Sequence, residues 1–177
     1  MDFALSKELQ MLKKAVSEFA AKKIVPYADE WDANHYFPYK EAVKPMGELG
    51  FFGTVIPEKY GGEDMGWLAT MIVTEEIAKA SSSLRVQVNM QCLGSAFTIC
   101  EYGDDALKQK YISKLVRAEY LGGFAITEPD AGSDLQSVKL RAFQDAAGNW
   151  FLHGVKRFIT NGCGEVLLVL ARSEPDR

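Results

Sequence analysis

The sequence has few of the residues that build metal centres or disulfide frameworks. Its three cysteines, Cys92, Cys100 and Cys163, include no C-x-x-C pair, and its two histidines, His35 and His153, stand alone. No His, Cys and carboxylate cluster has metal-ligand spacing, so we interpret both histidines as structural or surface residues. The odd number of cysteines, with no signal-like apolar run at the N-terminus, favours a reducing compartment, by default the cytoplasm.

Long apolar runs and an excess of positive charge are also lacking. No stretch approaches the roughly 20 apolar residues that span a bilayer. The formal net charge of −4 gives no electrostatic support for binding nucleic acid. At 177 residues, 47% hydrophobic and 25% charged, the chain has the composition of a globular protein. Its length suits one large domain, or one domain plus part of another.

The first 120 residues are predicted to be all-helical. Apolar side chains near the N-terminus recur at alternating steps of four and three, which predicts an amphipathic helix capped by Ser6 and ending at about Ile24, before Pro26. Further helices are expected over residues 39–49, 66–79, 84–102 and 104–118, with a loop over 57–62.

The pattern changes after Leu121. Short runs rich in β-branched and aromatic residues predict strands over 122–127, 138–144, 150–159 and 165–171. The chain stops before these strands could complete a barrel or sandwich of ordinary strand number. We therefore predict an α+β fold, with an all-α domain over residues 1–120 and the start of a β-barrel or sandwich domain over residues 121–177.

The most informative run extends from Phe124 to Asp134 and reads FAITEPDAGSD. It begins like a strand and ends in turn residues. Gly132 would let the backbone approach a ligand closely, and the hydroxyls of Thr127 and Ser133 suit a carbonyl or phosphate oxygen. From composition alone, an ordinary strand followed by a tight turn is the simpler interpretation, because turns use these residues everywhere.

The complete string resembles the signature of the acyl-CoA dehydrogenase family: a small residue, an aliphatic residue, Ser or Thr, Glu, two variable positions, a small residue, then Gly-Ser-Asp. Residues 125–137 fit it throughout, and 156–162, about thirty residues on, resemble the family's Lys-x-aromatic-Ile-(Ser/Thr)-Asn segment. The resemblance continues through 51–62 and 74–78. It implies the N-terminal helical domain and about half of the middle β-domain, with the C-terminal helical bundle absent.

The resemblance also implies a flavoprotein oxidoreductase. In this family a glutamate removes the α-proton of an acyl-CoA thioester while the β-hydride passes to FAD. Thr160 matches a hydroxyl near flavin N5, and Phe158 stands where most members carry tryptophan, so it keeps an aromatic face without the indole N–H. The implied cofactor-binding residues are Phe124, Ile126, Thr127, Gly132, Ser133, Phe158, Ile159 and Thr160.

A substrate preference is implied by residues 81–87, which resemble the corresponding stretch of the glutaryl-CoA dehydrogenase branch. An arginine there pairs with the distal carboxylate of a dicarboxyl-CoA, and Arg85 occupies that position. A guanidinium suits this task because it binds a carboxylate through two parallel hydrogen bonds. Ser133 is the second implied substrate-binding residue. From the residues alone, Arg85 is equally well interpreted as a surface arginine at a helix start.

No catalytic base is expected in this chain. Glu75 and Glu76 look like a solvated or capping pair on a helix, and Glu128 like a structural hydrogen-bond acceptor. The resemblance places the base in the C-terminal bundle, so this chain alone is predicted to be inactive.

These expectations describe the N-terminal fragment of an FAD-dependent acyl-CoA dehydrogenase. It would oxidise a short acyl-CoA, with glutaryl-CoA as the model dicarboxyl substrate, to the 2,3-enoyl-CoA in fatty acid or amino acid degradation. The implied partners are the acyl-CoA substrate, an electron-transfer flavoprotein as acceptor, and further copies of the intact chain. The alternative is a non-catalytic scaffold or interaction module that needs a separately encoded C-terminal half.

Overall fold

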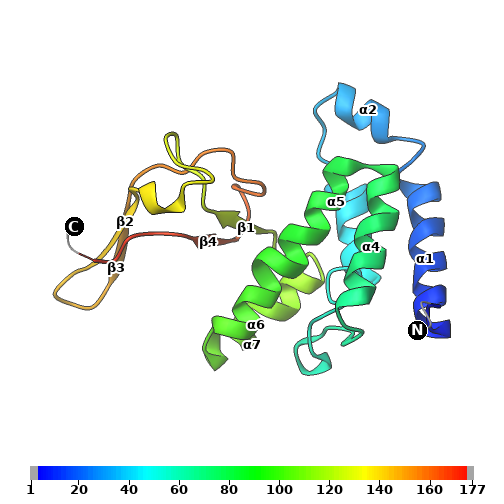
Figure 1. Cartoon of the computed structure of the whole chain (residues 1–177), viewed down its shortest axis with the longest axis horizontal. Helices are drawn as coiled ribbons and strands as arrows, with labels where there is room; N and C mark the ends of the chain where they lie inside the picture. Colours follow the sequence, from blue (N-terminus) through cyan, green and yellow to red (C-terminus); the bar gives the residue numbers. More distant parts are fainter. Residues whose placement is uncertain (1–3, 175–177) are drawn as a thin grey trace.

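The computed structural model describes residues 4–174 of the chain. The helices gather in one part of the molecule and the strands in another, and the two parts lie side by side along the longest axis (Figure 1). Strand β1 lies at the junction, next to the helical part. This arrangement agrees with the predicted α+β fold.

Seven α-helices form the helical part of the described chain. They are α1 (Lys7–Lys23), α2 (Ala28–Ala33), α3 (Lys44–Glu48), α4 (Trp67–Ala80), α5 (Ser82–Val88), α6 (Thr98–Tyr102) and α7 (Asp105–Val116). A π-helical turn, Tyr39–Val43, leads into α3, and a longer π-helical segment, Asn89–Phe97, joins α5 to α6. The predicted helix over 84–102 is therefore one continuous helical run with a π-helical middle.

The helix boundaries follow capping side chains. The Leu9 amide donates to Ser6 Oγ at 3.2 Å, and the Leu107 amide donates to Asp104 Oδ1 at 2.8 Å. Each bond satisfies an amide that has no partner within the first turn of its helix. The predicted cap at Ser6 is confirmed. Helix α2 was missed, because it is six residues long and none of its residues is buried to produce an apolar period.

Two apolar clusters hold the helical part together. The first is centred on α1, α3 and α4 and contains Val16, Ala20, Ile24, Ala42, Val43, Met46, Phe51, Phe52, Val73, Ile77, Leu84, Val88 and Ala118. The second contains Ile56, Ala96, Ile99, Ile112, Leu115 and Val116. Val166 and Leu168 of the strand part pack against the second cluster, so it also anchors the strands. Within residues 4–174, no helix has the length and apolar character that crossing a bilayer requires.

The strands form two separate two-stranded sheets. β1 (Gly122–Ala125) pairs in parallel with β4 (Val166–Val169), with Gly122 opposite Val166. β2 (Arg141–Gln144) and β3 (Trp150–His153) form an antiparallel hairpin. The described residues form no closed barrel.

The strands are shorter than predicted for a physical reason. The amides of Lys139 and Leu140 donate to the Glu128 carboxylate, so they are not available for a strand ladder before β2. After β3 the chain turns at Gly154, whose φ is 149°, and the Arg157 amide then bonds to Thr127 O. Polar contacts around β1 therefore replace the ends of two predicted strands.

One buried glutamine fixes where β1 begins. Gln91, in the π-helical segment, donates from Nε2 to Leu115 O at 3.0 Å and to Tyr120 O at 2.8 Å. Its Oε1 accepts the Gly122 amide at 2.6 Å. A Cβ on Gly122 would lie 2.2 Å from Ser95 Oγ, so only glycine permits this approach.

Candidate functional site

The two motif blocks of the sequence meet along β1 and its continuation. The Arg157 amide donates to Thr127 O at 2.9 Å, and Lys156 Nζ donates to Ile126 O at 2.8 Å. At the other end of β1, a Cβ on Gly123 would lie 2.8 Å from Thr160 O. The second block therefore runs beside the first in the opposite direction, which gathers the predicted residues 124, 126, 127, 159 and 160.

A buried ion pair fastens these blocks together. Lys156 Nζ donates to Glu128 Oε1 at 2.9 Å, and both side chains are buried. Burial alone would raise the pKa of Glu128, but the amides of Lys139 and Leu140, together with Lys156, favour the ionised form and lower that pKa to about 2. The Glu128 carboxylate accepts hydrogen bonds from the Lys139 and Leu140 amides and from Lys156, as expected for a structural acceptor.

Three hydroxyl groups of the motifs have no hydrogen-bond partner within the described residues. Among residues 4–174, the side chains of Thr127, Ser133 and Thr160 make no hydrogen bond, and Thr127 and Thr160 are half-buried beside β1. Hydroxyls in such positions can donate to or accept from the heteroatoms of a bound molecule. They are the part of this surface best suited to a polar ligand.

Phe158, two residues before Thr160 in the sequence, exposes its aromatic ring. It is 80% exposed, and its φ of 58° is unusual for a bulky residue. The Arg157 guanidinium carbon lies 4.5 Å from the ring centroid, within cation–π range. Unusual backbone conformations cluster at functional sites, so this exposed ring is a candidate ligand contact.

Gly132 and Ser133 lie apart from this arrangement. Both are exposed in the loop that follows Glu128, and a Cβ on Gly132 would meet no atom within 4 Å. Packing within the described residues therefore does not require glycine at this position. Its predicted role in close approach to a ligand stays a prediction.

Arg85 lies on α5, in the helical part, and is half-buried. No carboxylate lies within ion-pair distance of its guanidinium in residues 4–174. Gln87 on the same helix accepts a hydrogen bond from Asn161 Nδ2 at 2.9 Å, which brings α5 against the second motif block. Residues two apart on a helix face different directions, so Arg85 and Gln87 serve different neighbours.

The interpretation of Glu75 and Glu76 was wrong for one of the two. Glu75 is exposed and pairs with Lys79, but Glu76 is only 6% exposed. Glu76 lies 2.7 Å from Lys79 Nζ and 3.7 Å from Lys13 Nζ, so α4 and α1 share an ion pair at a buried carboxylate. Glu76 falls on the same face of α4 as the buried Ala69, Ile72 and Val73, so the helical period could have indicated this burial.

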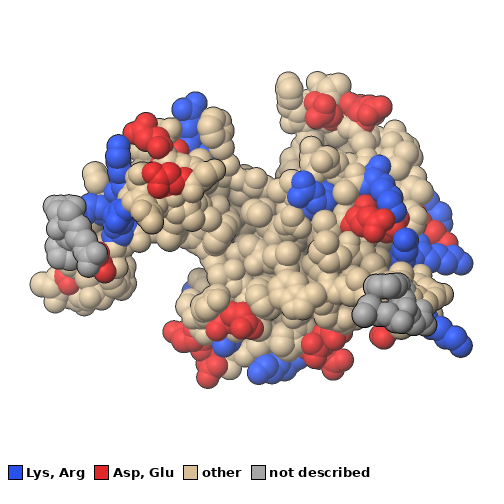
Figure 2. Space-filling view, viewed as in Figure 1, with Lys and Arg blue, Asp and Glu red and all other residues tan. Residues whose placement is uncertain are grey.

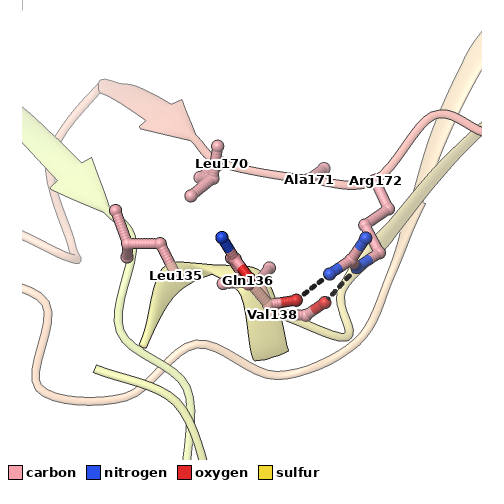
Figure 3. A pocket seen from close by; sticks show the side chains of 6 residues that line it. All are labelled: Leu135, Gln136, Val138, Leu170, Ala171 and Arg172. Atoms are coloured by element: carbon pink, nitrogen blue, oxygen red, sulfur yellow. Dashed lines mark hydrogen bonds between the residues drawn. The ribbon is translucent and has the colours of Figure 1, made fainter. Parts of the chain in front are cut away.

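A pocket of about 470 Å³ lies beside the loop that follows the first motif (Figure 3). The Arg172 side chain reaches across it and donates to the carbonyls of Gln136 and Val138. Its lining residues are Leu135, Gln136, Val138, Leu170, Ala171 and Arg172. None of the sequence-predicted site residues belongs to this pocket, so it is not the centre of the motif surface.

The sequence reasoning missed three amides that organise the site: Gln87, Gln91 and Asn161. Gln87 and Gln91 are buried and lie four residues apart on one helical run. Polar residues at that spacing share one helix face, a signal that could have indicated a buried polar contact.

No group of three or more metal-ligating side chains lies together in residues 4–174. In the view of Figure 2, the surface where the two parts meet is largely uncharged, and charged side chains lie on the strand part and along the edges and face of the helical part.

The family models match nearly the whole chain. Residues 6–119 match the acyl-CoA dehydrogenase N-terminal domain, and residues 123–177 match the acyl-CoA dehydrogenase middle domain. The chain therefore belongs to the acyl-CoA dehydrogenase family.

Individual relatives point to one branch of the family. The chain is 61% identical to a glutaryl-CoA dehydrogenase of Desulfococcus multivorans, over 98% of this chain and 45% of that protein. A solved glutaryl-coenzyme A dehydrogenase in complex with glutaryl-CoA superposes with a TM-score of 0.94 at 62% identity, covering 97% of this chain and 44% of the other. The Mycobacterium smegmatis glutaryl-CoA dehydrogenase in complex with FADH2 gives a TM-score of 0.91 at 28% identity, over 96% of this chain and 44% of that one.

The chain thus spans less than half the length of the relatives that it matches. Its two matched domains correspond to the N-terminal and middle domains of the family. These matches give no support to a non-catalytic scaffold.

Proposed function

We propose that this chain is the N-terminal part of an FAD-dependent acyl-CoA dehydrogenase that oxidises glutaryl-CoA or a similar short dicarboxyl-CoA to its 2,3-enoyl-CoA. The observation that carries the proposal is the meeting of both motif blocks along β1. There the Lys156–Glu128 pair fastens the blocks while the hydroxyls of Thr127 and Thr160 stay unpaired. We further propose that residues 1–120 and 121–177 act as the helical and partial β-domains, and that the protein works in the cytoplasm.

The residues along β1 fit a flavin. An isoalloxazine ring needs hydrogen-bond donors for its heteroatoms and an apolar or aromatic surface for its face, which Thr127, Thr160 and Phe158 offer. Bound FAD would supply the redox chemistry by accepting the β-hydride of the substrate. Phe124, Ile126 and Ile159 would border the cofactor, while Gly132 and Ser133, in their exposed loop, would contact its phosphate or the acyl-CoA.

Within this scheme the chain's own groups bind and orient. The Thr160 hydroxyl would donate a hydrogen bond that favours the electron-rich, reduced ring. Lys156 holds the Ile126 carbonyl and the Glu128 carboxylate, so the backbone beneath Thr127 is fixed before any ligand binds. Such preorganisation avoids rearranging dipoles during the reaction.

Arg85 would select the substrate. Its guanidinium has no acidic partner within residues 4–174, so it is available for the distal carboxylate of a dicarboxyl-CoA. The proton-abstracting base would come from outside these residues, as the resemblance implies; the oxygens of Glu128 already accept from Lys139, Leu140 and Lys156. An electron-transfer flavoprotein would reoxidise the cofactor, and the intact protein would assemble with further copies of itself.

A chimera tests this proposal. Residues 1–177 are joined to the part of the Desulfococcus multivorans glutaryl-CoA dehydrogenase that lies beyond the 45% matched here. We expect a yellow protein that retains FAD through desalting and reduces an artificial acceptor when glutaryl-CoA is added. A folded chimera without a flavin spectrum and without acceptor reduction would refute the proposal.

The role of Arg85 is tested with two substrates in the same chimera. Arg85→Met removes the guanidinium, and leaving a buried carboxylate unpaired costs about 2 to 5 kcal/mol. We expect kcat/KM to fall at least thirtyfold for glutaryl-CoA and much less for butyryl-CoA, while Arg117→Met, at an exposed arginine, changes neither. Equal losses for both substrates would show that Arg85 does not recognise the carboxylate.

A further inference from the structure

We propose that Gln87 is a positioning residue: through Asn161 it fixes the loop 158–162 and thereby the Thr160 hydroxyl. The inference rests on the proposed function in assigning Thr160 to the flavin. Gln87 lies on α5 in the helical part, whereas Asn161 lies in the second motif block, 74 positions later in the chain. The contact therefore joins two parts of the protein that the sequence gives no reason to connect.

The hydrogen-bond geometry fixes the orientation of both amides. Asn161 Nδ2 donates to Gly122 O at 3.0 Å and to Gln87 Oε1 at 2.9 Å. A backbone carbonyl can only accept, so Gly122 determines which end of the Asn161 amide faces β1. Gln87 must then present its oxygen. It is 5% exposed, so water cannot readily take its place.

The loop depends on the conformation of Asn161. Its φ is 56°, in the left-handed region, which asparagine and aspartate adopt more readily than other non-glycine residues. Two backbone bonds close the loop around it: the Gly162 amide donates to Ile159 O at 3.0 Å, and the Gly164 amide donates to Asn161 O at 2.8 Å. Such a conformation persists when the surrounding contacts hold it, and here the side-chain contacts are those to Gly122 and Gln87.

Thr160 has no side-chain hydrogen bond of its own within residues 4–174. Its carbonyl packs so closely on β1 that a Cβ on Gly123 would lie 2.8 Å away. The position of the Thr160 hydroxyl therefore follows the backbone that Asn161 holds. Gln87 is two residues beyond Arg85. Helix α5 therefore carries both the proposed substrate-binding arginine and the glutamine that positions this loop.

The first experiment needs no flavin. Amide hydrogen exchange is measured in the flavin-free chimera for Gln87→Met, which has a similar volume but no acceptor oxygen. We expect the Gly162 and Gly164 amides to exchange at least tenfold faster than in the parent protein. In the flavin-loaded chimera we expect kcat to fall tenfold to a hundredfold while KM changes less than twofold, because a small displacement of a positioned group has such effects.

Two variants control for general loosening. Thr70→Val removes a buried hydroxyl of the helical part that pairs with the Thr54 hydroxyl at 2.6 Å and contacts neither Gly122 nor Asn161. It should lower the melting temperature without selectively accelerating exchange at Gly162 and Gly164. Gln87→Glu keeps an acceptor oxygen in either protonation state and should restore slow exchange and most of kcat.

Each outcome decides the inference. Exchange within twofold of the parent in Gln87→Met, or equal acceleration in Thr70→Val, would overturn it. If Gln87→Met does not fold, Asn161→Asp removes the donor while tolerating a positive φ, and selectively faster exchange at Gly162 and Gly164 is again required. A parent chimera that takes up no FAD refutes the proposed function alone, because the exchange experiment still tests the loop.

Discussion

The helical and strand parts of this protein are stabilised differently. The helical part buries its large apolar side chains in two clusters, including Phe52, Ile77 and Leu115. The β2–β3 hairpin instead exposes Phe143, Trp150 and other large apolar residues on its strands. Since apolar burial is the main favourable term in folding, the strand part depends more on specific polar contacts.

Those polar contacts are few and buried. The Glu128–Lys156 pair joins the two motif blocks, and Gln91 and Asn161 fix the start of β1. The helical part is therefore stabilised by apolar packing, whereas a small number of hydrogen bonds stabilise the conformation of the strand part. The proposed cofactor residues lie on that surface, so the same contacts that hold the strands also position the site.

The largest expected effect is the difference in dehydrogenase activity and FAD retention between residues 1–177 alone and the chimera. Residues 1–177 alone should have no measurable dehydrogenase activity and should lose FAD during desalting. Phe158 is 80% exposed and the motif hydroxyls lie on one open wall, so a bound ring would remain in water. Flavin retention, acyl-CoA oxidation and oligomer size are measured for both proteins. A monodisperse, yellow and active 177-residue chain would contradict this prediction.

The next effect is confined to the strand part. Lys156→Met leaves the Glu128 carboxylate buried without its cation, and breaking a buried pair in this way costs about 3 to 5 kcal/mol. The Leu140 amide donates to Glu128, so we expect its opening free energy, measured by native-state hydrogen exchange, to fall by that amount. Exchange in α1 and α4 should change little.

Lys139→Met is the matched control for this variant. Lys139 pairs with Asp130 at 3.2 Å in the same region, but both side chains are 74% exposed. Exposed pairs contribute little, so we expect a change below about 0.5 kcal/mol. Equal effects of the two substitutions would show that the strand part does not depend on the buried pair.

Acid should act on the strand part first. The pKa of Glu128 is about 2 in the folded protein, below its ordinary value of 4.5. The folded state therefore gains stability from this group above pH 4.5 and loses it as the pH falls from 4.5 toward 2.

Exchange at the Leu140 amide as a function of pH, corrected for the intrinsic rate, measures this loss. We expect local protection to fall over that pH range in the parent chain and to be much less pH-dependent in Glu128→Gln. Loss of α1 and α4 protection at the same pH as Leu140 would indicate one cooperative unit instead of two.

Much of the fold was predictable because it depends on local signals. The cap at Ser6, the end of α1 and the change from helices to strands after Leu121 each follow from neighbouring residues. The shortening of the strands could not be predicted from local signals, because the Lys139 and Leu140 amides bond to Glu128, eleven and twelve positions earlier. Likewise, the parallel pairing of β1 with β4 joins segments about forty residues apart.

The membership of the proposed site stays a prediction from the sequence, whereas its connections could not be predicted from the sequence. The motif blocks identified Thr127, Thr160 and Phe158, because short strings of residue types can be matched directly to a family. The contact between Gln87 and Asn161 joins different parts of the fold, and it required the positions of both backbones. Residue types alone cannot supply such a distance.

The smallest expected effect compares one acidic residue from each part. Asp104 caps α7 by accepting the Leu107 amide at 2.8 Å, and Asp145 accepts the Ala147 and Asn149 amides in the turn between β2 and β3. Helix α7 contributes Ile112 and others to an apolar cluster, so Asp104→Ala should lower the free energy of unfolding of the helical part by about 1 kcal/mol.

Asp145→Ala should leave that unfolding transition unchanged and accelerate exchange only in the hairpin, because the turn is exposed and joins strands whose large side chains are exposed as well. Denaturant unfolding followed by helical circular dichroism reports the first variant, and amide exchange at Asn149 reports the second. A shift of the helical transition by Asp145→Ala equal to that from Asp104→Ala would mean that the hairpin and the helices unfold together.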